Sequence, residues 1–170
     1  LRNLSGFGCR LVAYDPYHND EAAKLAEYVS LEQLFKESDV ITFHTPATES
    51  SFHMVNAESM KTMKDGVVIV NTARGSIIDT PAFLDALESG KVGAAALDVI
   101  ENELGIFYGD YKYQNIGHRE MSILKDLPNV LMLPHMAFYT EDAISDMVEH
   151  SIQSILNKDG NVVPYAHKER

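Results

Sequence analysis

The chain has few basic residues, a single cysteine and no long apolar run, and each shortage excludes a class of protein. Lysine and arginine number 14 against 25 aspartates and glutamates, so the net charge of -11 repels nucleic-acid phosphates. The single cysteine, Cys9, cannot form a disulfide within the chain, and we expect it to be a small core residue. No apolar run reaches the roughly 18 residues of a membrane span, and no signal peptide is found. We therefore expect no membrane partner and a reducing, cytoplasmic location.

The chain has enough apolar residues to form the hydrophobic core of one domain, because 45% of its 170 residues are hydrophobic. Short predicted strands and helices alternate along the chain, which predicts a parallel sheet in a doubly wound α/β domain. Residues 101–118 lack periodicity and are predicted to form a long loop. The predicted strands are 9–14, 40–44, 67–70, 92–97 and 130–133. The predicted helices are 20–28, 31–37, 56–63, 80–90, 121–126 and 140–158, and residues 1–8 read as the end of another helix.

Polar residues follow five of the predicted strands, and the carboxyl ends of parallel strands meet at one edge of a sheet. The central strand is Val67-Val68-Ile69-Val70, whose consecutive β-branched residues predict burial on both faces. Arg74 follows this strand and can offer its planar donors to a carboxylate; the alternative is an arginine solvated on a loop. The residues that follow the five strands are Asp15, Thr45 and Pro46, Thr72 to Arg74, Asp98, and Pro134 with His135.

Several of these positions, together with Glu103 in the long loop, have side chains suited to a dehydrogenation site. Asp15 ends a strand where a carboxylate accepts hydrogen bonds from ribose hydroxyls, and its charge favours NAD over NADP; the alternative is an aspartate that starts a turn before Pro16. His135 is suited to move a proton near neutral pH, although a histidine can also be held at a strand edge by structural hydrogen bonds. A carboxylate such as Glu103 beside this imidazole would orient it. Arg74, Glu103 and His135 together supply what the reduction of a 2-keto acid by a hydride requires.

Three segments of the sequence resemble the D-2-hydroxyacid dehydrogenases. Residues 70–79, 95–103 and 129–140 carry the resemblance, and residues 105–108 are most similar to the D-lactate dehydrogenase branch. The resemblance implies a Rossmann-like fold and NAD-dependent hydride transfer between the nicotinamide and a 2-keto or 2-hydroxy acid. The reacting acid itself stays open: lactate, 2-hydroxyglutarate and branched or aromatic hydroxy acids all remain possible.

The same resemblance implies roles for individual residues. Arg74 would bind the substrate carboxylate and polarise the keto group, His135 would be the acid/base, and Glu103 would be its partner. Asp15 would hold the adenosine ribose, and no metal site is implied. The residues that would line the cofactor are Thr45, Pro46, Thr72, Ala73 and Asp98, and Phe138 would lie near the substrate side chain.

The chain departs from the family in its glycine-rich turn. No Gly-x-Gly-x-x-Gly motif is present, since residues 6–11 lack the third glycine and precede the wrong strand. We therefore expect residues 1–170 to form a partial dinucleotide-binding domain, without the first strand, the pyrophosphate-binding turn or the substrate domain. Alone it is expected to be inactive and to bind NAD weakly or not at all. Without the first strand, its two neighbouring strands would have unpaired edges. We expect these edges to be covered by a complementing N-terminal segment, by a homodimer, or by direct pairing of the two strands with each other.

Two other functions remain open at this point. A module that senses NAD or binds another protein could use the same fold, because a fold does not determine function. An inactive remnant of a dehydrogenase is the other possibility, favoured by the missing glycine motif. The intact set of Arg74, Glu103 and His135 favours an enzyme, because a sensor needs no such set.

Overall fold

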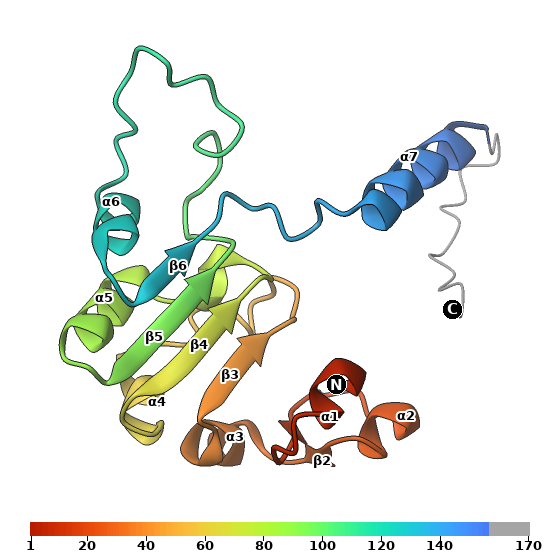
Figure 1. The fold of residues 1–170 in the computed structure, drawn as a ribbon, viewed down its shortest axis with the longest axis vertical. Helices are drawn as coiled ribbons and strands as arrows, with labels where there is room; N and C mark the ends of the chain where they lie inside the picture. Colours follow the sequence, from red (N-terminus) through yellow and green to blue (C-terminus); the bar gives the residue numbers. More distant parts are fainter. Residues whose placement is uncertain (157–170) are drawn as a thin grey trace. The chain divides into compact units, whose positions relative to one another are not determined.

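The computed structural model describes residues 1–156, and the chain divides into two units, Leu1–Pro134 and His135–Arg170. The first unit contains a parallel sheet of four strands in the order β3-β4-β5-β6, seen as adjacent arrows in Figure 1. This arrangement of parallel strands and connecting helices confirms the predicted Rossmann-like α/β fold. The strands are β3 (Val40–Phe43), β4 (Val67–Asn71), β5 (Val92–Leu97) and β6 (Val130–Met132).

Helices connect these strands and pack against one another in sequence order. Each begins where a side chain accepts hydrogen bonds from the first free backbone N–H groups. The helix predicted over 80–90 begins after Asp79, which is its N-cap and accepts from the Ala82 N–H at 3.3 Å. The helices are α3 (Leu31–Glu37), α4 (Ala57–Thr62), α5 (Thr80–Glu88) and α6 (Arg119–Asp126), with a short 3-10 turn η1 (Gly75–Ile77) after β4.

The two faces of the four-stranded sheet are buried unequally. On one face Ile41, Ile69 and Ala95 lie in register and are buried in the core. On the other face Val68 and Val70 are half-buried, and Leu131 is 60% exposed. The prediction that the 67–70 strand is buried on both faces is therefore wrong for one face.

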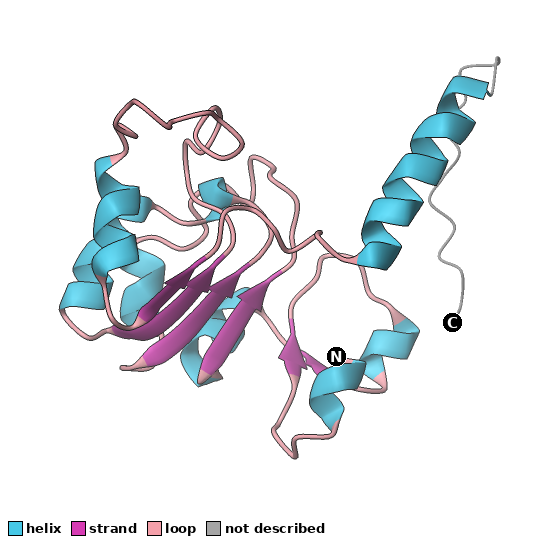
Figure 2. Ribbon diagram, turned by 45° about the horizontal axis from the view of Figure 1, so that its top comes forward, coloured by secondary structure: helices cyan, strands magenta, loops and turns pink. Residues whose placement is uncertain are grey.

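A second, smaller sheet lies in the N-terminal part of the first unit. It consists of β1 (Val12–Ala13) and β2 (Glu27–Tyr28), which are parallel and stand apart from the larger sheet in Figure 2. Within the described residues no hydrogen-bonded ladder joins β1 to β3. These are the two strands expected to flank the absent first strand. Their direct pairing, one of the three expected ways to cover their edges, is therefore not observed. The sheet is accompanied by α1 (Arg2–Ser5) and α2 (Asp20–Ala23).

Two predictions in this part of the chain are wrong. The helix predicted over 20–28 ends at Ala23, because residues 27–29 pair with β1 through the Glu27 N–H to Leu11 O and Val29 N–H to Ala13 O bonds. Tertiary pairing thus overrides helical periodicity. Cys9 is exposed rather than in the core, since it precedes β1, which starts only at Val12.

The described part of the second unit contains α7 (Glu141–Leu156), capped by Thr140 Oγ1, which accepts from the Ala143 N–H at 3.2 Å. Four of its apolar residues are exposed: Met147, Val148, Ile152 and Ile155. The predicted end of this helix at 158 lies outside the described residues. No helix that the structure describes is long and apolar enough to span a membrane.

Candidate active site

Asn71 shapes the turn that presents Arg74. The side chain of Asn71 is fully buried at the end of β4, where its Oδ1 accepts from the Ala73 N–H and its Nδ2 donates to Arg74 O, both at 3.0 Å. The side chain thereby closes the turn over residues 71–74 and leaves Arg74 exposed, with Nη1 donating to Ala73 O at 2.6 Å. Thr72 is exposed at the same turn and Ala73 is buried.

The turn after Arg74 lies directly against the loop that carries Glu103. A Cβ at Gly75 would lie 2.1 Å from the carbonyl carbon of Ile100, so no side chain fits there. The Glu103 Oε2 accepts from the Ile100 N–H at 2.8 Å, which folds the carboxylate back onto the start of its own loop. The structure thus brings the segments of Arg74 and Glu103 together.

The remaining residues predicted at this edge follow the neighbouring strands. Thr45 and Pro46 come after β3, where the buried Ser51 donates its hydroxyl to Pro46 O at 2.7 Å. Asp98 follows β5 and is 2% exposed, and its N–H donates to Asn71 O at 2.9 Å. Parallel pairing therefore places these residues at the same sheet edge as Arg74.

Asp15 does not belong to this edge by strand pairing. It follows β1, in the smaller sheet, so the expectation that five strand ends share one edge holds for the four strands of the larger sheet only. Its Oδ1 accepts from the Tyr17 N–H at 2.8 Å, which is the turn-starting role weighed as the alternative. Asp15 is also exposed, so its second oxygen remains accessible to solvent.

His135 and Phe138 belong to the second unit, in the segment that precedes α7. His135 is half-buried and has a φ of 54°, in the left-handed region that non-glycine residues rarely adopt. Such backbone strain is concentrated at functional sites. Phe138 is 38% exposed, with its ring edge-on to Tyr139 at 6.2 Å.

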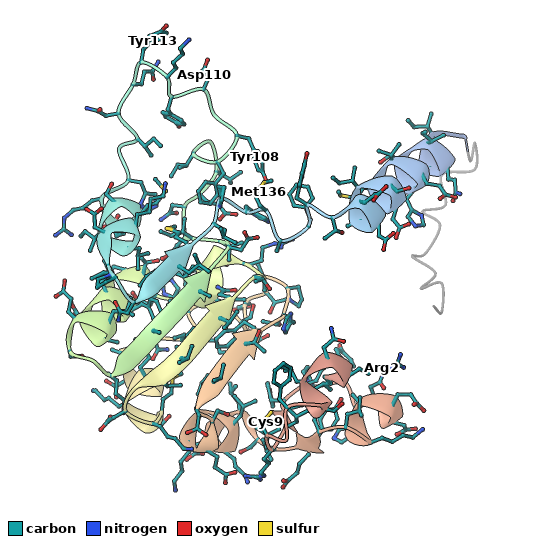
Figure 3. All side chains as sticks on the ribbon, in the orientation of Figure 1. Arg2, Cys9, Tyr108, Asp110, Tyr113 and Met136 are labelled. Carbon is teal, nitrogen blue, oxygen red and sulfur yellow. The ribbon has the colours of Figure 1, made fainter. Side chains whose placement is uncertain are left out.

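Sequence reasoning missed the residues that support this site. Asn71, Ser51 and Gly75 carry no chemistry of their own, and their contacts with distant backbone atoms have no local pattern in the sequence. The one available signal was an asparagine at the end of an apolar strand. The long loop 101–118 was predicted, and its exposed Tyr113 and Asp110 lie at the outer end of the loop in Figure 3.

Comparison with known proteins identifies the family to which the chain belongs. Residues 1–137 match the family described as D-isomer specific 2-hydroxyacid dehydrogenase, NAD binding domain. The chain belongs to this family. NAD is thus the cofactor that this type of domain binds, as the sequence resemblance implied.

Individual relatives agree with this assignment. The chain is 41% identical over 156 residues to an aromatic 2-oxoacid reductase of Clostridium sporogenes, covering 91% of this chain and 47% of that protein. A D-lactate dehydrogenase structure from Treponema pallidum aligns with a TM-score of 0.86 at 42% identity, over 91% of this chain and 48% of that one. An NAD-complexed D-isomer specific 2-hydroxyacid dehydrogenase from Lactobacillus delbrueckii aligns at 0.85 and 31%, over 91% and 47%. The chain thus spans about half the length of the relatives it matches.

Proposed function

We propose that the protein containing this chain is an NAD-dependent D-2-hydroxyacid dehydrogenase, and that residues 1–170 supply its dinucleotide-binding domain. The observation that carries the proposal is the contact between the Arg74 turn and the Glu103 loop at the carboxyl ends of β4 and β5. This sheet edge is where ligands bind in open α/β folds. The substrate domain would come from outside this chain.

In this proposal Arg74 and His135 act on the substrate directly, and two further side chains assist them. Arg74 binds the substrate carboxylate through its planar donors and polarises the keto oxygen. His135 donates a proton to that oxygen during reduction and accepts the hydroxyl proton during oxidation. Glu103 orients the imidazole of His135, and Phe138 lies near the substrate side chain.

The residues present fit part of a dinucleotide. Thr72 and Pro46 are exposed and Thr45 half-buried at a shared strand edge, where they would line the cofactor together with Ala73 and Asp98. Asp15 would hold the adenosine ribose through the carboxylate oxygen that does not close its own turn. When bound, NAD supplies or accepts the hydride. The pyrophosphate would be held by residues outside this chain, because the sequence contains no Gly-x-Gly-x-x-Gly motif.

The proposed substrate class is small 2-keto and 2-hydroxy acids, and the proposed partner is a complementing N-terminal segment or a second copy of the chain. Support for a partner comes from β1 and β3, each of which has a strand partner on one side only within the described residues. A cytoplasmic location remains a prediction. Two of the relatives named above are an aromatic 2-oxoacid reductase and a D-lactate dehydrogenase, so an aromatic 2-oxo acid and pyruvate are both tested below.

The test replaces His135 by alanine in the complete protein and measures NADH oxidation with pyruvate and with an aromatic 2-oxo acid. We expect turnover to fall roughly 10²–10⁴-fold, the usual contribution of general acid–base catalysis, with NADH affinity unchanged. The matched control is His18→Ala, because His18 is exposed and its ring stacks on the half-buried Tyr28. Unchanged turnover in His135→Ala would remove His135 from this role, and NADH binding without turnover in the unsubstituted protein would favour a sensor.

A further inference from the structure

A histidine outside the proposed catalytic set binds a glutamate next to Glu103. His53 Nε2 lies 2.7 Å from Glu101 Oε1, and the two side chains are 29% and 19% exposed. The Phe52 ring stacks on the imidazole with ring centroids 3.9 Å apart. The backbone of His53 has a φ of 47°, which is rare for a residue with a side chain and is retained only where surrounding contacts hold it.

The backbone around His53 is attached to the turn that follows Arg74. The His53 N–H donates to Ser76 O at 2.9 Å, and the Val55 N–H donates to Ile77 O at 3.0 Å. Val55 also forms an isolated parallel bridge with Ile78. Because these bonds pair residues 53–55 with residues 76–78, the His53 ring has a fixed position relative to the Arg74 turn.

Glu101 is held on its side chain and on its main chain. Thr80 Oγ1 donates to its Oε2 at 3.4 Å, and its carbonyl oxygen lies 3.0 Å from His118 Nε2. The Met121 N–H donates to His118 Nδ1, which therefore accepts and leaves Nε2 as the protonated nitrogen that donates to Glu101 O. The start of the Glu103 loop is thus anchored to α5, to α6 and to His53.

One residue separates this anchor from Glu103. Asn102 has a φ of 59°, a left-handed conformation that asparagine tolerates, so the chain reverses between the two glutamates. Glu103 then turns its carboxylate back to the Ile100 N–H. The position of Glu101 therefore determines where the Glu103 carboxylate lies.

We propose that His53 and Glu101 are positioning residues, whose imidazole–carboxylate bond holds the Glu103 loop in place against the Arg74 turn. This inference rests on the proposed function for its catalytic meaning. Neither side chain is assigned contact with substrate or cofactor. Asp79 Oδ2 lies 4.0 Å from His53 Nδ1, so a second carboxylate faces the other ring nitrogen and helps to keep the ring in place.

The first experiment measures the loop itself, without any assay of activity. Amide hydrogen exchange is followed in His53→Gln, Glu101→Gln and the double variant, with Glu58→Gln as the control for loss of an acid. Glu58 is exposed and pairs only with Lys61 on α4, among the ion pairs of the described residues. We expect exchange of the Ile100 amide to rise roughly tenfold in each variant of the pair, while the Ile69 amide in β4 stays protected.

The double variant is the sharper measure of a single shared contact. If the two side chains act through one bond, exchange in the double variant will be no faster than in either single variant. Glu103→Ala, which removes the acceptor of the Ile100 N–H, gives the upper limit of the effect. Ile100 protection that is unchanged in both single variants, or effects that add in full, would overturn the proposal.

The second experiment tests the catalytic consequence in the complete protein. We expect kcat/KM for the 2-keto acid to fall by about 10–100-fold in His53→Gln and Glu101→Gln, since small misplacements of catalytic groups have effects of this size, while the Kd of NADH stays unchanged. Faster Ile100 exchange with normal kcat/KM would overturn the positioning role. If the unsubstituted protein shows no turnover, the proposed function fails, while the exchange result still decides whether the contact holds the loop.

Discussion

The buried side-chain amide of Asn71 stabilises the turn over residues 71–74 through hydrogen bonds to the backbone. It is fully buried, accepts from the Ala73 N–H and donates to the carbonyl oxygen of Arg74. Replacing it by alanine leaves both groups without that partner. We expect Asn71→Ala to lower the free energy of unfolding by about 1–3 kcal/mol, the usual cost of unsatisfied buried polar groups, as measured by urea unfolding.

The control for this substitution is Asn3→Ala, because Asn3 is exposed on α1 and should change stability by less than about 0.5 kcal/mol. Equal stabilities of the two variants would show that water replaces the amide at the Arg74 turn. In that case the turn would be held by the Gly75 contact instead.

The positions of some candidate residues were predictable because a polar side chain directly follows an apolar strand. Arg74 and Asp98 each follow an apolar strand of the larger sheet, and the structure places both at its carboxyl edge. Asp15 follows a strand by the same pattern, but its strand lies in another sheet. A single sequence indicates where a strand ends but not which strands pair with each other. It therefore could not show that Asp15 follows a strand of a different sheet from Arg74 and Asp98.

At the scale of whole elements, Arg10 joins the small sheet to α3. Its guanidinium lies 2.7 Å from both Glu27 Oε2 on β2 and Glu37 Oε2 at the end of α3. The hydrogen bond from Arg10 lowers the pKa of the Glu37 carboxyl below its ordinary value of 4.5. Since the pKa is lowered in the folded chain, the pair stabilises it above pH 4.5 and this stabilisation is lost as pH falls through the lowered value.

The substitution Arg10→Gln tests this link by NMR titration of the Glu37 side-chain carboxyl. We expect the pKa of Glu37 to rise toward its ordinary value, and part of the lowering to remain because Gln33 also donates to this carboxylate. Arg2→Gln on α1 serves as the matched loss of a positive charge. A Glu37 pKa that does not respond to Arg10→Gln would mean that the exposed pair is not formed in solution.

Elements with strong local signals were predicted well. The helix over 31–37 has its serine cap and the strand over 92–97 has a pattern of small apolar residues, and both have the predicted bounds. The failure at 20–28 is of another kind, because β2 exists only through its pairing with β1. Pairing between distant segments leaves no trace in local periodicity.

At the scale of the whole molecule, the lack of a glycine-rich turn in the sequence bears on cofactor binding. The 170-residue chain has no glycine-rich turn to receive a pyrophosphate, so calorimetric titration with NAD should give no sharp 1:1 transition at micromolar affinity. Adding a separately produced N-terminal segment should restore both binding and pyruvate-dependent NADH oxidation. A tight titration of the 170-residue chain alone would contradict this expectation.

The unequal burial of the larger sheet has a consequence for how the chain responds to denaturant. Val40 and Leu131 are already 60% exposed in the folded state, and Val68 and Val70 are half-buried. Unfolding therefore exposes less additional apolar surface to water than in an α/β domain whose sheet is covered on both sides. Both the urea m-value and the heat-capacity increment of unfolding scale with the surface area that unfolding exposes. Calorimetry and urea titration of this chain should give values of both below those of a two-sided domain of equal length.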